Sequence, residues 1–109
     1  MSRSGKVYMK NQFCGLLSET DEGYLFVYDV LYLQNSAAQF VSPTFPLTEK
    51  PYFSKTLFAF FDGLIPEGWL LDLAEKNWKI NYKDRMELLL RCCKDCIGAV
   101  SLEKVNEEL

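Results

Sequence analysis

The 109-residue sequence contains no histidine, so it lacks the side chain that most often serves as a general base near neutral pH. It also lacks both glycine-rich phosphate-binding patterns, G-x-x-x-x-G-K-[ST] and G-x-G-x-x-G. A kinase active site needs a phosphate-covering loop, a lysine and two aspartates on a larger fold. Phe61-Asp62-Gly63 has the letters of the kinase metal motif in another order and is interpreted as a turn. The sequence therefore predicts a protein that is not an enzyme.

No apolar run approaches the ~20 residues that span a bilayer, and no signal-peptide core follows the polar start of the chain. We therefore expect a cytoplasmic protein without membrane contact. The net charge is −3, which argues against direct nucleic-acid binding, because phosphate neutralisation requires clustered lysine and arginine. Hydrophobic residues make up 49% and charged residues 25%, as in ordinary globular proteins. The length predicts one domain over residues 1–109.

The four cysteines offer few metal ligands. Cys93 and Cys96 form a C-x-x-C, but there is no second such pair and no histidine to complete a zinc site. A redox pair is expected at a helix start after a strand, whereas this one lies at a predicted helix end. We interpret Cys14, Cys92, Cys93 and Cys96 as reduced, half-buried residues that bind no metal, and no cofactor is expected. A cysteine nucleophile at Cys93 or Cys96 stays as a third hypothesis, against which the missing histidine weighs.

Residue patterns predict three N-terminal strands and one C-terminal strand. Residues 7–10 and 13–17 flank Asn11-Gln12, which indicates a hairpin. A polar turn at 18–23 leads to an aromatic and β-branched strand at 24–28. Residues 99–105 alternate and predict the final strand.

The middle of the chain is less regular. Residues 29–38 allow one helical turn, and residues 40–47 alternate but contain two prolines, which predicts an edge strand or extended segment. Residues 48–53 are expected to be a loop. Ser54 is then expected to cap a short helix over 55–61.

Two further helices are predicted. Pro66 suits a first helical position, and Glu67 complements the helix dipole. Asp84 with Glu87 forms a capping box. The apolar positions expected to face the core are Leu57, Phe60, Phe61 and Leu64 in the first helix, Trp69, Leu70 and Leu73 in the second, and Met86, Leu89, Leu90 and Cys93 in the third. Strands and helices are thus segregated, which predicts an α+β fold with a small antiparallel sheet and about three helices.

The most specific segment is residues 57–69, Leu-Phe-Ala-Phe-Phe-Asp-Gly-Leu-Ile-Pro-Glu-Gly-Trp. It resembles the first N-terminal subdomain of HipA-like protein kinases, the toxins of bacterial toxin–antitoxin modules. Residues 7–16, 24–28, 41–47 and 94–100 resemble other segments of that subdomain in the same order. The chain departs from the family's usual residues at Ala59, Gly63 and 92–94.

The resemblance implies a role. In three-component modules the subdomain is a separate antitoxin, HipS, which acts with a kinase, HipT, and a helix-turn-helix operator-binding protein, HipB. The chain is therefore expected to bind a HipT-like serine/threonine kinase directly and neutralise it, within a ternary complex that includes a HipB-like protein. The alternative is a structural or regulatory subunit, or an excised subdomain, that does not inhibit.

The turn that opens the second helix is the candidate kinase contact, with a tryptophan as its anchor. The residues concerned are Gly63, Leu64, Ile65, Pro66, Glu67 and Trp69. Burial of Trp69 with Leu70 and Leu73 is the competing expectation. Trp78 lies outside the matched segment and is the natural control. Asp62 and Glu67 are interpreted as helix-end charges and not as a catalytic carboxylate pair.

Overall fold

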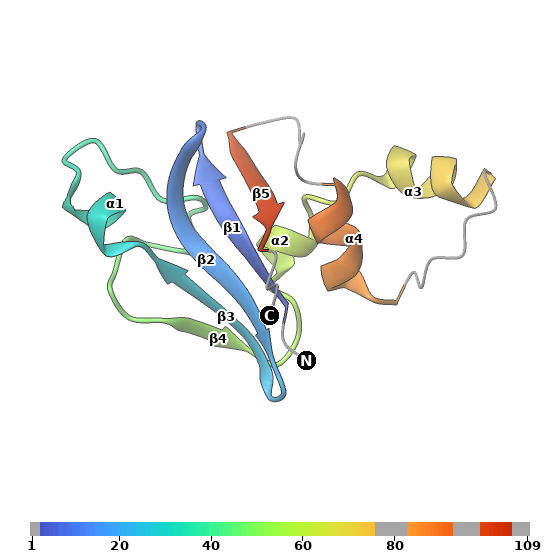
Figure 1. Cartoon of the computed structure of the whole chain (residues 1–109), viewed down its shortest axis with the longest axis horizontal. Coiled ribbons are helices and arrows are strands. Elements are labelled where there is room, and N and C mark those ends of the chain that lie inside the picture. Colours follow the sequence, from blue (N-terminus) through green and yellow to red (C-terminus); the bar gives the residue numbers. More distant parts are fainter. Residues whose placement is uncertain (1–2, 76–82, 93–98, 106–109) are drawn as a thin grey trace.

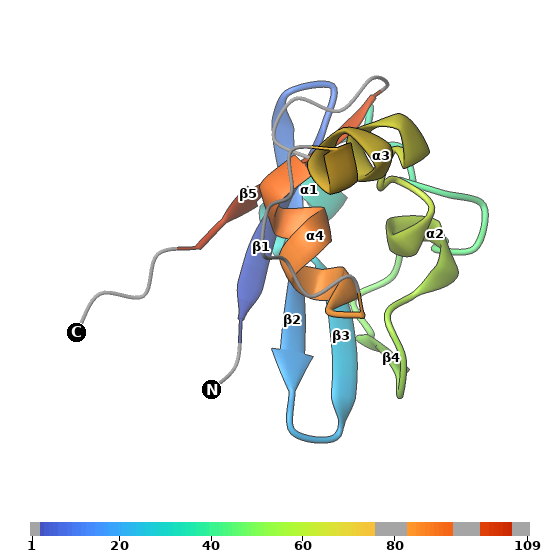
Figure 2. The ribbon, with the colours of Figure 1, turned by 90° about the vertical axis from the view of Figure 1, so that its right-hand side faces the viewer.

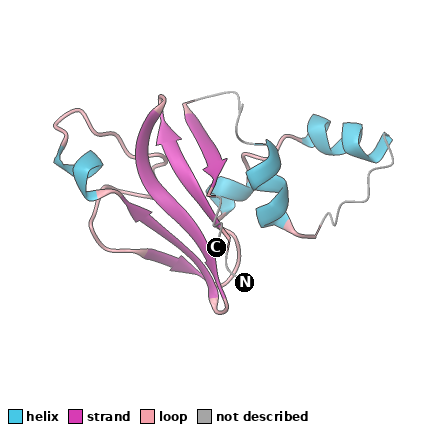
Figure 3. Cartoon of the chain, viewed as in Figure 1, coloured by secondary structure: helices cyan, strands magenta, loops and turns pink. Residues whose placement is uncertain are grey.

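The fold is a five-stranded antiparallel sheet with helices packed on one face, seen in a computed structural model that describes residues 3–75, 83–92 and 99–105 (Figures 1 and 3). The strands are β1 (Ser4–Met9), β2 (Gln12–Thr20), β3 (Gly23–Tyr28), β4 (Tyr52–Ser54) and β5 (Val100–Lys104). The helices are α1 (Val30–Gln34), α2 (Ala59–Asp62), α3 (Glu67–Glu75) and α4 (Arg85–Cys92). The predicted α+β class is confirmed, with four helices described where about three were expected.

The strand order is β4-β3-β2-β1-β5, with every neighbouring pair antiparallel. The first hairpin turns at Lys10 and Asn11, whose φ angles of 50° and 67° are typical of a two-residue type I′ turn. The turn is therefore one residue earlier than the predicted Asn11-Gln12. The predicted last strand is confirmed as β5, and it pairs with β1 from the opposite end of the sequence.

The prediction of an edge strand at residues 40–47 is wrong, because this segment contains turns and bends. Backbone groups of this segment form hydrogen bonds with tyrosine hydroxyls in place of a neighbouring strand. The buried hydroxyl of Tyr28 donates to the carbonyl of Phe45 at 2.5 Å and accepts from the amide of Val41 at 3.1 Å. The hydroxyl of Tyr52 donates to the carbonyl of Pro46 in the same segment, and the hydroxyl of Tyr32 bonds both backbone groups of Gln39, the residue just before it. The edge strand next to β3 is instead β4, which lies partly in the predicted 48–53 loop.

The predicted cap at Ser54 is also wrong. Ser54 is the last residue of β4, and α2 begins at Ala59 after Phe58, which gives no side-chain cap. Phe61 of this short helix is fully buried and contacts Phe26 and Phe45. The position of α2 is therefore better explained by burial of the Phe61 ring than by an N-terminal cap.

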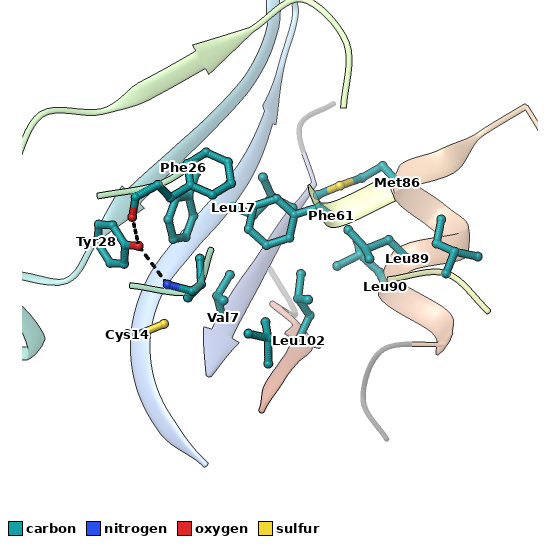
Figure 4. Close-up of a cluster of buried hydrophobic side chains, with 14 of the residues drawn as sticks. Val7, Cys14, Leu17, Phe26, Tyr28, Phe61, Met86, Leu89, Leu90 and Leu102 are labelled. Atoms are coloured by element: carbon teal, nitrogen blue, oxygen red, sulfur yellow. Dashed lines mark hydrogen bonds between the residues drawn. The ribbon is translucent and has the colours of Figure 1, made fainter. Parts of the chain in front are cut away.

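The core lies between one face of the sheet and the helices (Figures 2 and 4). Figure 4 shows Val7, Leu17 and Phe26 from the strands opposite Met86 and Leu89 from α4. At Gly15 the backbones of β2 and β3 approach closely, since a Cβ there would lie 2.6 Å from the carbonyl oxygen of Val27. Among residues 3–75, 83–92 and 99–105, no helix has both the length and the apolar character needed to cross a membrane.

Candidate partner-binding site

The segment from α2 to α3 makes a compact turn that backbone hydrogen bonds define. The amide of Gly63 donates to the carbonyl of Ala59 at 2.9 Å, and the amide of Leu64 donates to that of Phe61 at 3.1 Å. The amide of Ile65 donates to the carbonyl of Asp62 at 3.2 Å. The local shape is therefore held by main-chain hydrogen bonds.

Pro66 lies immediately before α3, and its carbonyl accepts from the amide of Leu70 at 3.3 Å. Its missing N–H costs nothing there, because the first amides of a helix have no intrahelical acceptor. Glu67 places a carboxylate in the first turn, where it complements the helix dipole. The predicted start of this helix is thus confirmed to within one residue.

The six predicted contact residues differ in exposure. Gly63, Pro66 and Glu67 are exposed and Leu64 is half-buried, whereas Ile65 is only 5% exposed and belongs to the core. Ile65 can therefore hold the turn in place but presents almost no surface. Of the other five, Gly63, Pro66 and Glu67 are exposed, whereas Leu64 and Trp69 are half-buried and pack against the core.

Trp69 is neither fully exposed, as expected for a contact anchor, nor fully buried, as expected for a core residue. Its side chain is half-buried and packs against the edge of the core, as does that of Leu70. The adjacent Leu71 is 67% exposed and adds apolar surface that the helical pattern did not assign to the site. The sequence could have indicated the exposure of Leu71 only through its place on the side of the helix opposite Trp69 and Leu73. Trp78, the proposed control, lies outside the described residues.

An ion pair fixes the base of the turn. Asp62, the last residue of α2, accepts a 2.5 Å hydrogen bond from Nε of Arg85, the first residue of α4. The sequence suggested only a helix-end role for Asp62, because a partner 23 positions away gives no local signal. The turn is therefore tied to the most deeply buried helix, and its position relative to the core is well defined.

The cysteines within the described part of the chain are not arranged for catalysis. Cys14 is fully buried, and this burial raises the pKa of its thiol to about 12, far above the range of a reactive thiolate. Cys92 is half-buried and its thiol contacts the carbonyl of Leu89 at 3.7 Å. Cys93 and Cys96, which carried the metal and nucleophile alternatives, lie outside the described residues. No metal-binding group of three or more acidic or cysteine side chains occurs in the described portion.

Comparison with known proteins identifies the family. Residues 5–103 match the model of the HipA N-terminal domain. The chain belongs to the HipA N-terminal domain family. A solved structure described as the N-terminal domain of HipA toxin superposes with a TM-score of 0.70 at 31% identity, covering 97% of this chain and 95% of that one.

A relative from Haemophilus influenzae, described as an uncharacterized protein, is 35% identical over 105 residues. The match covers 96% of this chain and 95% of the relative, so the two are similar in length. The chain is thus related to a domain of the HipA toxin and is itself not the kinase domain.

Proposed function

We propose that this chain is an antitoxin subunit that binds a HipA-like serine/threonine kinase toxin and neutralises it, in a complex with a helix-turn-helix DNA-binding partner. The observation that carries the proposal is the near end-to-end match to the N-terminal domain of the HipA toxin. A domain related to one part of a toxin has the shape to occupy the corresponding place on a kinase. The chain itself then contributes binding and not catalysis.

The edge formed by Gly63, Leu64, Pro66, Glu67 and Trp69 is the proposed kinase contact. It combines exposed backbone, one acidic side chain and a large ring that is only partly used by the core. Tryptophan is enriched among the residues that dominate binding energy, because it removes much apolar area from water with few rotatable bonds. In the inhibitory arrangement this edge faces the nucleotide or activation region of the kinase and obstructs its active form.

Growth rescue tests the proposal. Coexpression of this chain with the kinase should restore growth that the kinase alone arrests. Trp69→Ala should fold, as judged by circular dichroism, yet bind at least about thirtyfold more weakly and fail to protect. That factor corresponds to the roughly 2 kcal/mol typical of an interface anchor. Phe40→Ala is a matched control, since Phe40 is an aromatic residue that is 48% exposed and distant in sequence from the turn.

Each contrary outcome has a distinct meaning. Persistent arrest despite a stable complex would favour a structural subunit that does not inhibit. Full protection by folded Trp69→Ala would remove the turn from the inhibitory contact. Unfolding of this variant would assign Trp69 to the core, and Glu67→Lys, which alters an exposed side chain of the same edge, would then test the edge.

A further inference from the structure

The face of the sheet that points away from the core carries many apolar side chains. Val7, Leu17 and Phe26 are fully buried on the opposite face, which α2 and α4 cover (Figure 4). Because successive side chains of a strand alternate between the two faces, their neighbours point outward. The outward apolar residues, here called the outer patch, are Tyr8 in β1, Phe13 and Leu16 in β2, Leu25 and Val27 in β3, and Phe53 in β4. A sheet face that meets only water normally carries polar side chains at such positions.

The outer patch is continuous across four strands. Phe53 of β4 lies opposite Leu25 of β3, and Val27 of β3 lies opposite Leu16 of β2. The two rings that the patch has in β1 and β2 lie opposite each other, edge to face, with centroids 6.0 Å apart. Phe53 is 52% exposed and Leu16 is 37% exposed. Contiguous apolar surface of this kind marks an interaction site, whereas scattered exposed apolar residues do not.

The charges beside the outer patch are balanced. Lys6 of β1 and Glu103 of β5 lie opposite each other, are both exposed, and are the charged residues among the described strand positions on this face. This face therefore has no net charge, although the whole chain has a net charge of −3. A basic partner would favour an acidic surface, whereas two copies of an acidic chain meet best where their mutual repulsion is smallest.

The same two charges also make the face complementary to itself. A two-fold axis can place Lys6 of one copy against Glu103 of the other, and the reverse contact then forms by symmetry. No like charges are brought together in that arrangement. Charge and apolarity thus both favour a second copy of this chain as the occupant of the face.

We propose that the outer patch packs against the outer patch of a second copy of this chain, in a two-fold symmetric dimer of stacked sheets. Sheets packed face to face lie about 10 Å apart, and their facing side chains interdigitate. Five strands of about six residues, spaced about 4.8 Å apart, cover on the order of 500 Å². This area is below the roughly 800 Å² per partner of a standard interface, so we expect a weak dimer with a Kd on the order of 10–100 µM.

The dimer would leave the candidate kinase contact accessible. The segment from α2 to α3 belongs to the layer on the other face of the sheet, where Phe61 and Ile65 join the core. If the proposed function holds, one dimer would bind two kinase molecules on opposite sides. The dimer itself does not depend on that function.

Sedimentation equilibrium of the purified chain tests the dimer without a kinase. Between about 5 and 500 µM, a range that spans the expected Kd, the apparent mass should rise from 12.6 kDa toward twice that value. Leu16→Glu puts a charge into the middle of the outer patch and should weaken association at least about tenfold. Leu31→Glu is the matched control, because Leu31 is 75% exposed in α1, outside the patch, and association should not change. Circular dichroism checks that both variants fold.

A charge exchange tests the symmetric contact. Lys6→Glu leaves two glutamates on the face, and Glu103→Lys leaves two lysines, so each variant alone should associate about tenfold more weakly. An equimolar mixture of the two variants should recover the affinity of the wild type. Recovery on mixing requires two different chains, so it does not arise from a contact within one chain.

A chain that stays monomeric at every concentration would overturn the proposal. A dimer that tolerates a folded Leu16→Glu variant would use another face and would overturn it as well. If Leu16→Glu does not fold, the mixing experiment decides, because both of its substitutions are at exposed positions, and absence of recovery would then overturn the proposal. A monomer whose outer-patch amides shift only when kinase is added would assign this face to the kinase instead. Growth rescue is scored separately, so failure of the dimer and failure of the antitoxin function are distinguishable.

Discussion

Helices α3 and α4 have similar lengths but different relations to the core. In α4, the side chains of Met86, Leu88, Leu89 and Leu90 are all buried. In α3, none of residues 67–71 is buried, and Leu71 is 67% exposed. Figure 1 shows α4 against the sheet and α3 projecting from it. One helix therefore builds the core, and the other presents surface.

The polar contacts of the two helices differ in the same way. Asp84 caps α4, and Arg3 joins this cap to Glu19 of β2 through hydrogen bonds of 2.7–2.9 Å. Around α3, the described contacts are the main-chain bonds of the preceding turn and the acidic first turn at Glu67. A helix held by a cap, ion pairs and buried leucines has a well-defined position, and the described start of α3 has fewer such contacts.

The largest expected effect is in the core of α4. Leu89→Ala should lower the free energy of unfolding by about 2–5 kcal/mol, because it removes buried methyl groups and leaves a cavity. Leu71→Ala in α3 should change it by less than about 0.5 kcal/mol, as for an ordinary surface site. Urea unfolding followed by circular dichroism measures both. Equal losses for the two variants would show that α3 is as much a part of the core as α4.

An intermediate effect is expected where Arg3 attaches α4 to the sheet. Arg3→Gln should lower the free energy of unfolding at neutral pH by roughly 1–2 kcal/mol, between an exposed ion pair and hydrogen bonds to charged groups. Arg91→Gln is the control, because Arg91 is 53% exposed and makes a local pair with Glu87 worth only about 0.3–0.5 kcal/mol.

The effect of Arg3 should depend on pH. Arg3 lowers the pKa of Asp84, and Arg91, with smaller contributions from Lys104 and Arg3, lowers that of Glu87. A carboxylate with a lowered folded-state pKa stabilises the fold above its unfolded value and loses this contribution as the pH falls through the folded value. The difference between wild type and Arg3→Gln should therefore shrink below about pH 4. A difference that stays constant down to pH 2.5 would contradict an ionic origin.

Local patterns predicted the elements whose causes are local. Alternation and turn residues gave the first three strands and β5, and Asp84 gave the start of α4. The helical pattern also identified Met86, Leu89 and Leu90 as core residues but missed Leu88. Since α4 contacts both α2 and β5, more than one of its faces is covered, and this follows from tertiary packing.

The failures occurred where distant groups decide the structure. The 40–47 segment alternates like a strand, but hydroxyls of Tyr28 and Tyr52 bind its backbone groups. At the candidate site, the sequence located the turn correctly, whereas the burial of Ile65 and the pair between Asp62 and Arg85 depend on three-dimensional contacts. The identity of the contact edge itself stays a prediction.

The smallest expected effect concerns Gly68 in the first turn of α3. A Cβ added at this position would meet no atom within 4 Å, so alanine fits without strain. Gly68→Ala should therefore raise the free energy of unfolding by up to about 1 kcal/mol, through better helix propensity and a less flexible unfolded chain. Gly15→Ala in β2 is the opposite control, since its Cβ would lie 2.6 Å from a backbone oxygen and should destabilise the fold. If Gly68→Ala gains stability but loses kinase binding, the new methyl group occupies the contact surface, which would confirm that α3 presents its first turn to a partner. If stability falls instead, this turn is packed more closely than α3's exposed position indicates, and the contrast with α4 fails.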